Sequence, residues 1–434
     1  MWVCCPEITP IIVNHYNKVF DFPTVSTGAR ASIIGKIRDD GMFVVHNGKE
    51  EIVNAPSSEV TKGFLYDRPY KEIQTNHSEP NIGEPNSYND ILIKILSHEN
   101  VCSRMPIYEK YDKQVQGRTY IETGLADAGV MAPFNSSEYP KEIRNVGIAL
   151  STDHNPLHGL INPYLSGVNA VVEAMRNVAS VGATPHAITD CLCYGNPEKP
   201  QQMWQFIEGV KGISDACKTI TLKHSKESPT PIIAGNVSFY NESKDKPIPP
   251  SPIVSCLGKI QNVKKTITMS FKKENSVIIL IGKRKNELGG SIFYDLHNEL
   301  GKNVPNPDLV EVKNQIYGIT DCIEKDLVFA CHDISEGGVA TSLCEMTFGN
   351  SIGCSVKIES KLSTEKILFS ETGGFILETK KENIESIQSI FNQYKLDTYI
   401  IGVTGGNKIK VNNTIDIKVD DAKTSWENGL RDKL

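Results

Sequence analysis

The residues best suited to bind a metal ion lie together on one predicted helix. Glu173 and Asn177 are four positions apart in the segment after Ser166, so a helix would place them on one face, one turn apart. A carboxylate and an amide oxygen in this arrangement suit Mg²⁺, which prefers oxygen ligands and often bridges to nucleotide phosphates. The same spacing is compatible with an exposed polar stripe, so spacing alone does not decide between the two interpretations.

Two acidic residues occur where predicted strands end. Asp153 follows the strand-like residues 147–150, and Asp190 follows a short apolar run. Ligands are often bound by the loops at strand ends, so both carboxylates are well placed for site chemistry. Each could instead be a turn-forming residue, because Asn or Pro stands near it in the sequence.

Two glycine-containing segments could contact phosphate. Gly235, Asn236 and Ser238 are predicted to share one short loop, where glycine allows close backbone approach and the polar side chains supply donors. A simple β-turn would have the same composition. In the second segment a predicted strand ends at Asp333, and residues 335–338 then open a helix. Backbone N–H groups at such a helix start can hold phosphate, and Asp333 could hold the metal.

These residues must be positioned by alternating strands and helices. Residues 107–260 contain two clear helices, one capped by Ser166 and ending before Gly182, the other beginning after Pro200. The second helix has an apolar face at helical spacing, formed by Met203, Phe206, Ile207, Val210 and Ile213. After about residue 260, strands and helices follow in mixed order, which predicts a second α/β unit.

The first hundred residues predict less regular structure. Residues 29–53 contain three β-type runs separated by turns at residues 40–41 and 47–48, so three strands are expected. Residues 76–90 are polar and rich in Pro and Gly, which is typical of a linker. A short amphipathic helix is expected at about Tyr88–Leu96.

The composition is that of an ordinary globular protein, with 39% hydrophobic and 23% charged residues among 434. The net charge of -6 gives no global field that would favour nucleic acid or an anionic membrane, and no apolar run approaches the ~18 residues of a membrane helix. The eleven cysteines form no disulfide or zinc-site frame, so we expect buried thiols in a reducing cytoplasm. His154 and His158 are expected in loops or at the surface, because Pro156 separates them.

Taken in chain order, these segments resemble the PurL family of phosphoribosylformylglycinamidine synthase subunits. The resemblance extends over most of residues 100–380, whereas the first 75 residues resemble the family only loosely. The matching segments are residues 107–116, 126–130, 150–156, 162–185, 188–206, 231–243, 332–338 and 368–375.

The resemblance implies an α+β and α/β fold of the PurM-like superfamily. In that fold two α+β halves pair through their sheets, and an α/β domain follows each half. Residues 107–250 would form the second N-terminal-type domain and residues 251–434 the second C-terminal-type domain. Residues 1–75 would be the remainder of a preceding C-terminal-type domain, followed by a linker and short helix over residues 76–106.

Family members are ligases of purine biosynthesis, so the resemblance implies an ATP-dependent reaction. ATP activates the amide oxygen of formylglycinamide ribonucleotide as a phosphate ester, and ammonia displaces the phosphate to give the amidine. A PurQ-type glutaminase subunit supplies the ammonia, and a PurS-type subunit assists assembly. ATP and Mg²⁺ are therefore the expected cofactors, and no nucleic-acid or membrane partner is expected.

The resemblance also implies roles for particular residues. Asp190 and Gly235 would contact ATP at the catalytic site. Asn236 would hold the metal there, and Ser238 would contact the substrate. A second, structural nucleotide site known in the large form of the enzyme would use Asp127, Glu173, Asn177 and Asp333 as magnesium ligands and Ser335 as a nucleotide contact.

No catalytic residue is expected in this chain. The family's catalytic histidine and its Lys/Glu/His cluster belong to an N-terminal half for which no matching segment is found. We therefore expect a truncated product, a fragment, or one piece of a split enzyme whose partner is the N-terminal half. The alternatives are a non-catalytic nucleotide-binding subunit, or another enzyme of the superfamily such as aminoimidazole ribonucleotide synthase or a selenophosphate synthetase relative. Residues 189–200 and 235–243 argue against the last alternative.

Overall fold

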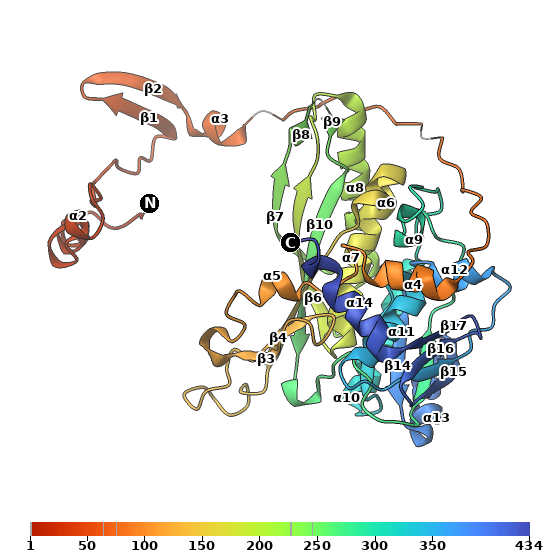
Figure 1. Cartoon of the computed structure of the whole chain (residues 1–434). Coiled ribbons are helices and arrows are strands. Elements are labelled where there is room, and N and C mark those ends of the chain that lie inside the picture. The colour runs from red at the N-terminus through yellow and green to blue at the C-terminus, as the bar shows by residue number, and fades with distance from the viewer. Residues whose placement is uncertain (1, 64, 75, 226–227, 245) are drawn as a thin grey trace. The chain divides into compact units, whose positions relative to one another are not determined.

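The computed structural model describes residues 2–63, 65–74, 76–225, 228–244 and 246–434. The chain divides into two compact units, Met1–Asp67 and Arg68–Leu434. Figure 1 shows the elements of each unit, coloured along the chain. Both large sheets and all of the predicted site residues belong to the second unit.

The first unit is small, and none of its described residues is buried. Its elements are α1 (Thr9–Asn14), a π-helical turn (His15–Val19), α2 (Phe22–Val25), β1 (Met42–Asn47), β2 (Glu50–Pro56) and α3 (Ser57–Lys62). The β1–β2 hairpin confirms the turn predicted at residues 47–48, where Gly48 has a φ of +64°. The strand expected before residue 40 is wrong: residues 29–39 form no strand, because β1 pairs only with β2 in a two-stranded sheet.

One carboxylate fastens the segment that was predicted as a linker. Glu79 Oε1 accepts hydrogen bonds from the backbone N–H groups of Lys302 and Asn303, both at 2.7 Å. Its Oε2 accepts a hydrogen bond from the Tyr294 hydroxyl at 2.8 Å. The segment is therefore anchored to the C-terminal part of the same unit.

The short amphipathic helix predicted after this segment is confirmed as α4 (Tyr88–Leu96). Ser87 is its N-cap, since the side chain accepts a hydrogen bond from the backbone N–H of Asp90. The helix buries Ile91, Leu92, Ile95 and Leu96, which recur at helical spacing. The short helix α5 (Met105–Tyr108) follows it.

A six-stranded sheet forms the first large layer of the second unit. Its strand order is β3-β4-β5-β10-β6-β7, and neighbours are antiparallel except for β6 and β7, which are parallel. The strands are β3 (Thr119–Ile121), β4 (Gly129–Met131), β5 (Gly147–Asp153), β6 (Thr184–Cys193), β7 (Ile232–Ser238) and β10 (Ser251–Ile260). The inner strand β10 begins directly after the predicted domain boundary between residues 250 and 251, and the last residue of this sheet is therefore Ile260.

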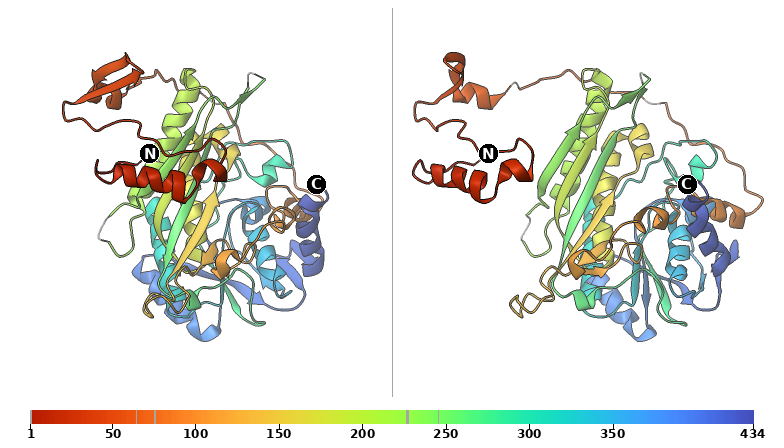
Figure 2. Two further views of the ribbon diagram at one scale, coloured as in Figure 1. Left: turned by 90° about the vertical axis from the view of Figure 1, so that its left-hand side faces the viewer. Right: turned by 60° about the vertical axis from the view of Figure 1, so that its left-hand side comes forward.

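Three helices accompany this sheet: α6 (Pro156–Ile161), α7 (Pro163–Ser180) and α8 (Pro200–Thr219). Helix α7 packs on β5, β6 and β10, as Figures 1 and 2 show. The alternation along β5 separates the two faces: Ser151 is buried and donates to the carbonyl of Ala174 in α7, whereas Leu150 is 55% exposed. A hairpin of short strands, β8 (Glu242–Ser243) and β9 (Lys246–Pro247), lies between β7 and β10 in the chain.

Helix α7 begins four residues earlier than predicted. Asn162 is its N-cap, because the side chain accepts a hydrogen bond from Leu165 N at 3.0 Å. The predicted cap, Ser166, is buried inside the helix and is therefore wrong. The predicted end is confirmed, since Gly182 follows the helix with a φ of +92° that favours glycine.

Glycines allow helices α7 and α8 to approach closely. A Cβ on Gly167 would lie 2.2 Å from the carbonyl oxygen of Gly209, and one on Gly212 would lie 2.0 Å from that of Tyr164. The apolar face predicted for α8 is only partly right, because Ile213 is buried but Val210 is 37% exposed. The buried positions of α8 are Gln202, Gly209, Gly212, Ile213, Ala216 and Cys217.

The second layer is a seven-stranded sheet that follows Ile260. Its order is β12-β14-β11-β15-β13-β16-β17. The strands are β11 (Val277–Ile281), β12 (Ala330–Asp333), β13 (Cys354–Val356), β14 (Phe375–Thr379), β15 (Thr398–Thr404), β16 (Lys408–Val411) and β17 (Ile415–Lys418). The helices are α9 (Ile292–Asp295), α10 (Leu309–Glu324), α11 (Gly338–Phe348), α12 (Thr364–Phe369), α13 (Ile384–Gln393) and α14 (Val419–Arg431).

Two apolar clusters meet at strand β11. Ile279 and Ile281 belong to the cluster around α7 and α10, whereas Ile278 and Leu280 belong to the cluster around α11 and α14. Because alternate residues point to opposite faces, this continuously apolar strand is buried on both sides. The cysteines are free and most are buried, as predicted. No helix in the described part of the chain is long and apolar enough to span a membrane.

Candidate functional site

Acidic side chains and one amide, from three elements and two connecting segments, meet at helix α7. Glu173 and Asn177 lie on α7 itself, as their spacing predicted, and Asp153 ends β5. Asp333 ends β12, and Asp127 lies in the connection between β3 and β4. Glu336 joins them from the segment between β12 and α11, where its charge acts on both Asp153 and Glu173. The structure thus brings together all four residues predicted as ligands of the second site, and adds two carboxyls to them.

Asp127 is engaged by protein donors on both oxygens. Its Oδ1 lies 2.6 Å from Nδ1 of His332, and its Oδ2 accepts a hydrogen bond from Asp333 N at 2.9 Å. The other ring nitrogen of His332 lies 3.0 Å from Oε2 of Glu345. Although burial opposes the charged imidazolium, the carboxylates of Asp127 and Glu345 raise the pKa of His332 well above its ordinary value.

Arg176 is the cation that reaches the other carboxylates. Its Nη2 lies 3.6 Å from Glu173 Oε2, and its Nε lies 3.5 Å from Asp333 Oδ2. The side chain is 4% exposed, and a Cβ on Gly373 would lie 2.1 Å from its Nη1. Glycine at position 373 therefore leaves the space that the guanidinium occupies.

The cluster carries more negative charge than its two cations balance. Burial, and then repulsion from Asp127, raises the pKa of Asp333 to about 7. Burial, and then repulsion from neighbouring carboxylates, raises the pKa values of Asp153 and Glu173 well above their ordinary range. Buried carboxyls of this kind are protonated or bind a cation, because an unpaired buried charge is costly.

The donor set fits a hard cation. Among the described residues, Asn177 Oδ1 is a buried oxygen without a hydrogen-bond partner, and Asp333 Oδ2 makes no hydrogen bond but forms the 3.5 Å ion pair with Arg176 Nε. The surrounding groups are carboxylate and amide oxygens, the ligands that Mg²⁺ selects. Asp127, His332 and Asp333 also offer ligand atoms within 4.8 Å of one another, but both nitrogens of His332 already face carboxylates.

The glycine-rich start of α11 differs from the predicted phosphate site. Gly337 N donates to Glu371 Oε1 at 2.9 Å, and Gly338 N donates to the carbonyl of Ser335 at 2.9 Å. These two amides are therefore already used inside the protein. The glycines are required by packing, since a Cβ on Gly338 would lie 2.7 Å from the carbonyl oxygens of Leu368 and Ser370.

The four residues predicted for the catalytic site lie on two adjacent strands. Asp190 on β6 is in register with Gly235 on β7, and Cys191 with Asn236, so residues 234–238 form a strand rather than the predicted loop. A Cβ on Gly235 would lie 2.6 Å from Asp190 Oδ1, so glycine is required beside this carboxylate. Burial raises the pKa of Asp190, whereas the backbone N–H of Asn236 lowers it.

Ser238 ends the same strand at the register position of Cys193. Its hydroxyl lies 3.1 Å from Asn241 Nδ2, which also donates to the carbonyl of Tyr194 at 3.0 Å. Asp190 and Asp153 flank Val254 of β10 on its two sides, so both carboxylates belong to one row of the sheet. Asp153 ends β5 as predicted, but Asp190 lies within β6, three residues before its end, so the prediction that Asp190 stands at a strand end is wrong. Adjacent strands are about 4.8 Å apart, which places these two residues roughly 10 Å apart.

Of the two histidines beside the cluster, His154 lies in the loop after β5, as predicted, whereas His158 lies neither in a loop nor at the surface. His158 lies in α6 and is 5% exposed, and neither ring nitrogen of His154 has a hydrogen-bond partner among the described residues. Burial lowers the pKa of His154 to about 4 and that of His158 to about 3. Both side chains are therefore neutral near pH 7.

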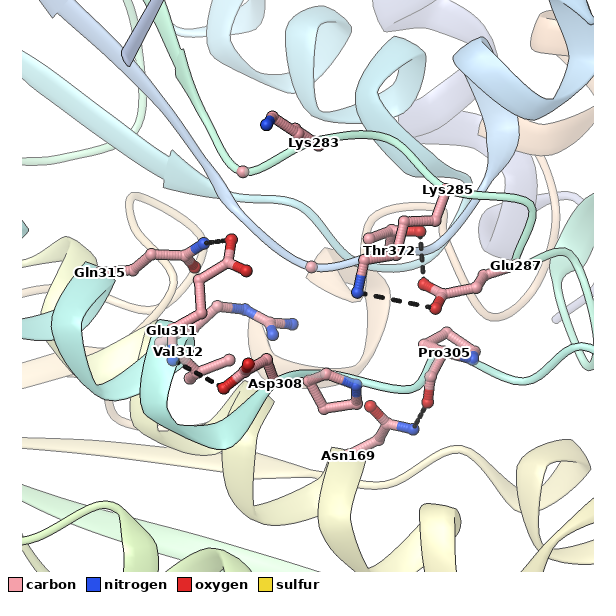
Figure 3. A pocket seen from close by; sticks show the side chains of 14 residues that line it. Asn169, Lys283, Lys285, Glu287, Pro305, Asp308, Glu311, Val312, Gln315 and Thr372 are labelled. Atoms are coloured by element: carbon pink, nitrogen blue, oxygen red, sulfur yellow. Dashed lines mark hydrogen bonds and ion pairs between the residues drawn. The ribbon is translucent and has the colours of Figure 1, made fainter. Parts of the chain in front are cut away.

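A further cleft, partly open to solvent, has Arg176 in its lining and is shown in Figure 3. Its walls are tied by internal hydrogen bonds: Gln315 to Glu311 at 3.0 Å and Thr372 to Glu287 at 2.7 Å. Asn169 donates to the carbonyl of Pro305 at 2.7 Å. Three cations and three carboxylates line it, so it has no strong net charge.

Sequence reasoning missed the two cations of the acidic cluster. Arg176 stands between Glu173 and Asn177 in the sequence, and its charge alone predicts a residue at the surface. His332 directly precedes Asp333, which was its only local signal. Its partner Asp127 is 205 positions away. The pairing therefore depends on how the two sheets are assembled.

Two family models match the chain. Residues 126–260 match the AIR synthase related protein, N-terminal domain, and residues 273–412 match its C-terminal domain. The subunit PurL of phosphoribosylformylglycinamidine synthase from Methanothrix thermoacetophila is 39% identical over 99% of this chain and 56% of its own length. The PurL subunit from Methanocaldococcus jannaschii is 35% identical over 91% of this chain and 54% of its own length. The chain thus spans about half the length of the curated relatives it matches.

Solved PurL structures share the fold. Thermotoga maritima PurL complexed with FGAR has a TM-score of 0.60 at 18% identity and covers 78% of this chain and 54% of that one. The structure of PurLQS from the same organism has a TM-score of 0.57 at 18% identity, over 79% of this chain and 52% of that one. T. maritima PurL complexed with ATP has a TM-score of 0.51 at 19% identity, over 85% of this chain and 49% of that one.

Proposed function

We propose, from the premise that the chain belongs to the PurL family of the PurM-like superfamily, that it supplies one half of a phosphoribosylformylglycinamidine synthase. The observation that carries this proposal is the pairing of Asp190 with Gly235 on adjacent strands, in the same unit as the acidic cluster on α7. The reaction would convert formylglycinamide ribonucleotide to its amidine, with ATP and glutamine-derived ammonia. The free cysteines suit the reducing cytoplasm, where we place this ligase of purine biosynthesis.

At the proposed catalytic site, Asp190 and Gly235 would orient ATP. The absent Cβ of Gly235 lets a ligand approach the backbone of β7 next to the Asp190 carboxylate. Asn236 would present its amide oxygen to the metal that accompanies ATP, and Ser238 would hold the substrate with its hydroxyl. Bound Mg²⁺ supplies positive charge that offsets the charge of the phosphate oxygens.

The groups that move protons would come from a second polypeptide or segment. The relatives are about twice as long as this chain. The open face of the six-stranded sheet supports a docked partner, because Met131 is 43% exposed and Leu150 55% exposed there. We propose that the complementary half of PurL packs on this face, and that PurQ-type and PurS-type subunits join the assembly. PurLQS of T. maritima, as its name states, contains such a set.

The test is ammonia-dependent ADP release from Mg-ATP and formylglycinamide ribonucleotide, measured for the purified chain alone and after mixing with a complementary N-terminal half of a PurL relative. Activity is expected only in the mixture. Asp190→Asn should reduce it by roughly 100-fold or more, as is typical for loss of a positioned electrostatic group. Asp215→Asn, on the surface of α8, is the matched control and should leave the rate unchanged. Activity of the chain alone, or an unaffected Asp190→Asn mixture, would contradict the proposal.

A second candidate function is a nucleotide-binding subunit that does no chemistry. The acidic cluster favours it, because Glu173, Asn177 and Asp333 could hold Mg-nucleotide without any nucleophile nearby, with Ser335 contacting the nucleotide. Binding of Mg-ADP or Mg-ATP without hydrolysis in every mixture would support this reading. Glu173→Gln should then abolish the binding, as measured by calorimetry.

A further inference from the structure

Two cysteines depart from the expectation that the thiols are buried. Cys191 and Cys193 are both partly exposed, whereas every other described cysteine of the second unit is buried. They stand two positions apart on β6, so their side chains point to the same face of the sheet. Their Sγ atoms lie 3.8 Å apart. Two thiols in this position can either react with each other or bind one ion together.

The pair lies on the open face of the six-stranded sheet. Cys191 is in register with Ile253 of β10, which is four positions before Leu257 and therefore points to the same side as that residue. Leu257 pairs with Leu150, which is 55% exposed on the face opposite α7. Solvent therefore reaches the two thiols from this face.

The backbone of β6 opposes a disulfide between the two thiols. Residues two apart in a strand have Cα atoms about 6.6 Å apart, from a rise of about 3.3 Å per residue. A disulfide needs Cβ atoms only about 3.5–4.5 Å apart, so the strand would have to bend. Strands β10 and β7 hold β6 from both sides here, because each pairs with Cys191 and with Cys193.

The same spacing fits a metal ion that both sulfur atoms share. Zinc–thiolate bonds are about 2.3 Å long, and two of them at the tetrahedral angle place their sulfur atoms about 3.8 Å apart. The observed Sγ separation of 3.8 Å therefore fits such an ion without any movement of the strand. Thiolate sulfur selects Zn²⁺ and similar thiophilic ions, whereas Mg²⁺ requires oxygen ligands.

Neighbouring polar groups support a cation at this place. Asn236 Nδ2 donates to Cys191 Sγ at 3.7 Å, and a hydrogen bond of this kind orients a metal ligand. Ser238 and Ser251 flank Cys193 in register on its two sides, so their hydroxyl groups stand next to the pair. Together with water, these hydroxyls supply the oxygen donors that a four-coordinate ion needs beside two thiolates.

We propose that Cys191 and Cys193 form a two-thiolate binding site for a thiophilic divalent cation of the Zn²⁺ class. On binding, each S–H bond breaks, the sulfur forms a bond to the cation, the proton passes to solvent, and no electron is transferred. Burial and the neighbouring thiol raise the pKa of Cys193, so near pH 7 the cation has to displace this proton. The site is separate from the Mg²⁺ of the proposed function and does not rest on that proposal.

A cation on the two thiols would interfere with the proposed function. Cys193 is the register neighbour of Ser238, the proposed substrate contact. Cys191 accepts the hydrogen bond from Asn236, the proposed metal ligand of the catalytic site. The bound ion would therefore lie against both residues and act as an inhibitor.

The test uses Co²⁺ alone as an optical probe on the full chain, with Cys4→Ser and Cys5→Ser in every protein to remove the thiols of the first unit. Co²⁺ on the two thiolates should give a sulfur-to-metal charge-transfer band and the strong visible bands of tetrahedral Co²⁺. Zn²⁺ should abolish both. Co²⁺ held only by oxygen atoms, as in the acidic cluster, has no charge-transfer band from sulfur, so the two sites are told apart.

Cys191→Ser and Cys193→Ser should each weaken Co²⁺ binding by roughly tenfold or more. Ser255→Ala, on the same face but hydrogen-bonded to Thr152, is the control and should bind Co²⁺ like the parent. Absence of the charge-transfer band in the folded parent, or its persistence in the double variant Cys191→Ser/Cys193→Ser, would overturn the proposal. Circular dichroism checks the folding of each variant.

A second measurement needs no variant of the pair. Zn²⁺ should protect Cys191 and Cys193 from alkylation by iodoacetamide, as measured by mass spectrometry of the peptide that contains both. Equal alkylation with and without Zn²⁺ would overturn the proposal, and so would conversion of the pair to a disulfide in air.

The inhibitory role is tested where the mixture with a complementary half releases ADP. Zn²⁺ should inhibit this release, and Cys193→Ser should raise the concentration for half-inhibition by roughly tenfold. Equal inhibition of both proteins would overturn the inhibitory role of the pair. A mixture that releases no ADP counts against the proposed function alone, because Co²⁺ binding and alkylation are measured on this chain by itself.

Discussion

His158 is a buried neutral histidine, and its titration makes stability depend on pH. Burial lowers its pKa to about 3, whereas an unfolded chain has a histidine pKa of about 6.5. Below pH 6.5 the unfolded state therefore binds a proton that the native state does not, so stability falls as pH decreases toward 3. Between about pH 6.5 and 5 this single residue should cost on the order of 2 kcal/mol of unfolding free energy.

We expect His158→Leu to flatten that pH dependence. Leu is of similar size and does not titrate, so the loss of unfolding free energy between pH 7 and pH 5 should shrink by about 2 kcal/mol. Urea unfolding of both proteins at the two pH values measures this difference. His77→Leu, in the extended segment before α4, is the control and should keep the parent slope. An unchanged slope in His158→Leu would show that His158 is protonated or exposed in the native state.

At the scale of single residues, local spacing predicted more of the site than charge did. The helical spacing of Glu173 and Asn177 was sufficient to place both on one face, and Asp153 was recognised at a strand end. The engagement of Asp127 by His332 could not be predicted, because it joins two sheets across 205 positions. The burial of His158 also could not be predicted, since polar residues near Pro and Asn are typical of surface loops.

At the scale of elements, helices α7 and α8 touch through their backbones at glycines. A Cβ on Gly167 would lie 2.2 Å from the carbonyl oxygen of Gly209 and 3.1 Å from Ile213 N. Because both neighbours are backbone atoms, the helices would have to separate. Glu173 and Asn177 are on the same helix, so this contact also sets the depth of the site.

Gly167→Ala should therefore destabilise the protein. Alanine favours a helix interior by about 1 kcal/mol over glycine, but overpacking costs typically 1–3 kcal/mol or more, and here the contact is with backbone. We expect a net loss of about 1–2 kcal/mol in urea unfolding. Gly129→Ala, where a Cβ would meet nothing within 4 Å, is the control. A Gly167→Ala protein as stable as the parent would mean that the helices are further apart than described.

The anchored segment before α4 makes a second prediction about an element. Glu79 accepts three hydrogen bonds. Each hydrogen bond to a charged group contributes about 1.5–3 kcal/mol to stability. Glu79→Ala should raise the hydrogen-exchange rates of the Lys302 and Asn303 amides by roughly tenfold or more and lower the melting temperature. Glu72→Ala, at an exposed position of the same segment, should change neither. Unaltered exchange in Glu79→Ala would show that the segment does not depend on this carboxylate.

Helices could be predicted where one face is apolar and the N-cap residue directly precedes the helix in the sequence. Helix α4 has both features, and its predicted range is the observed one. The predictions failed where pairing decides the outcome. Residues 234–238 have the composition of a loop but belong to β7, because they pair in parallel with β6. Residues 29–39 have the composition of a strand but form none, because they pair with no strand. A single sequence does not show which strands will pair with one another.

At the scale of the whole second unit, the six-stranded sheet has one face packed by α7 and an opposite face that remains partly apolar. Leu150 is in register with Leu257 of β10 on that open face, and Met131 of β4 is in register with Ile148. Contiguous exposed apolar patches usually mark a surface that another molecule covers. When the proposed complementary half is absent, the same face is available for self-association.

Leu150→Glu should therefore reduce self-association of the chain. A buried charge at the centre of an apolar contact is costly, so the dissociation constant in sedimentation equilibrium should rise by roughly tenfold or more. Folding should be unaffected, because Leu150 is 55% exposed and its neighbours Ala149 and Ser151 face α7. Val310→Glu, which is 53% exposed on α10 before substitution, is the control and should associate like the parent.

The same variant separates a general apolar tendency from a specific docking surface. If the open face is where a complementary half of PurL packs, Leu150→Glu should also weaken that heterologous complex and lower ADP release in the mixture, whereas Val310→Glu should do neither. If Leu150→Glu abolishes self-association but leaves complementation intact, the complementary half binds another surface. A charge at the centre of the open face should weaken both complexes if both use that face. A parent chain that stays monomeric at high concentration, and binds no complementary half, would instead remove the physical reason for regarding this face as an interface.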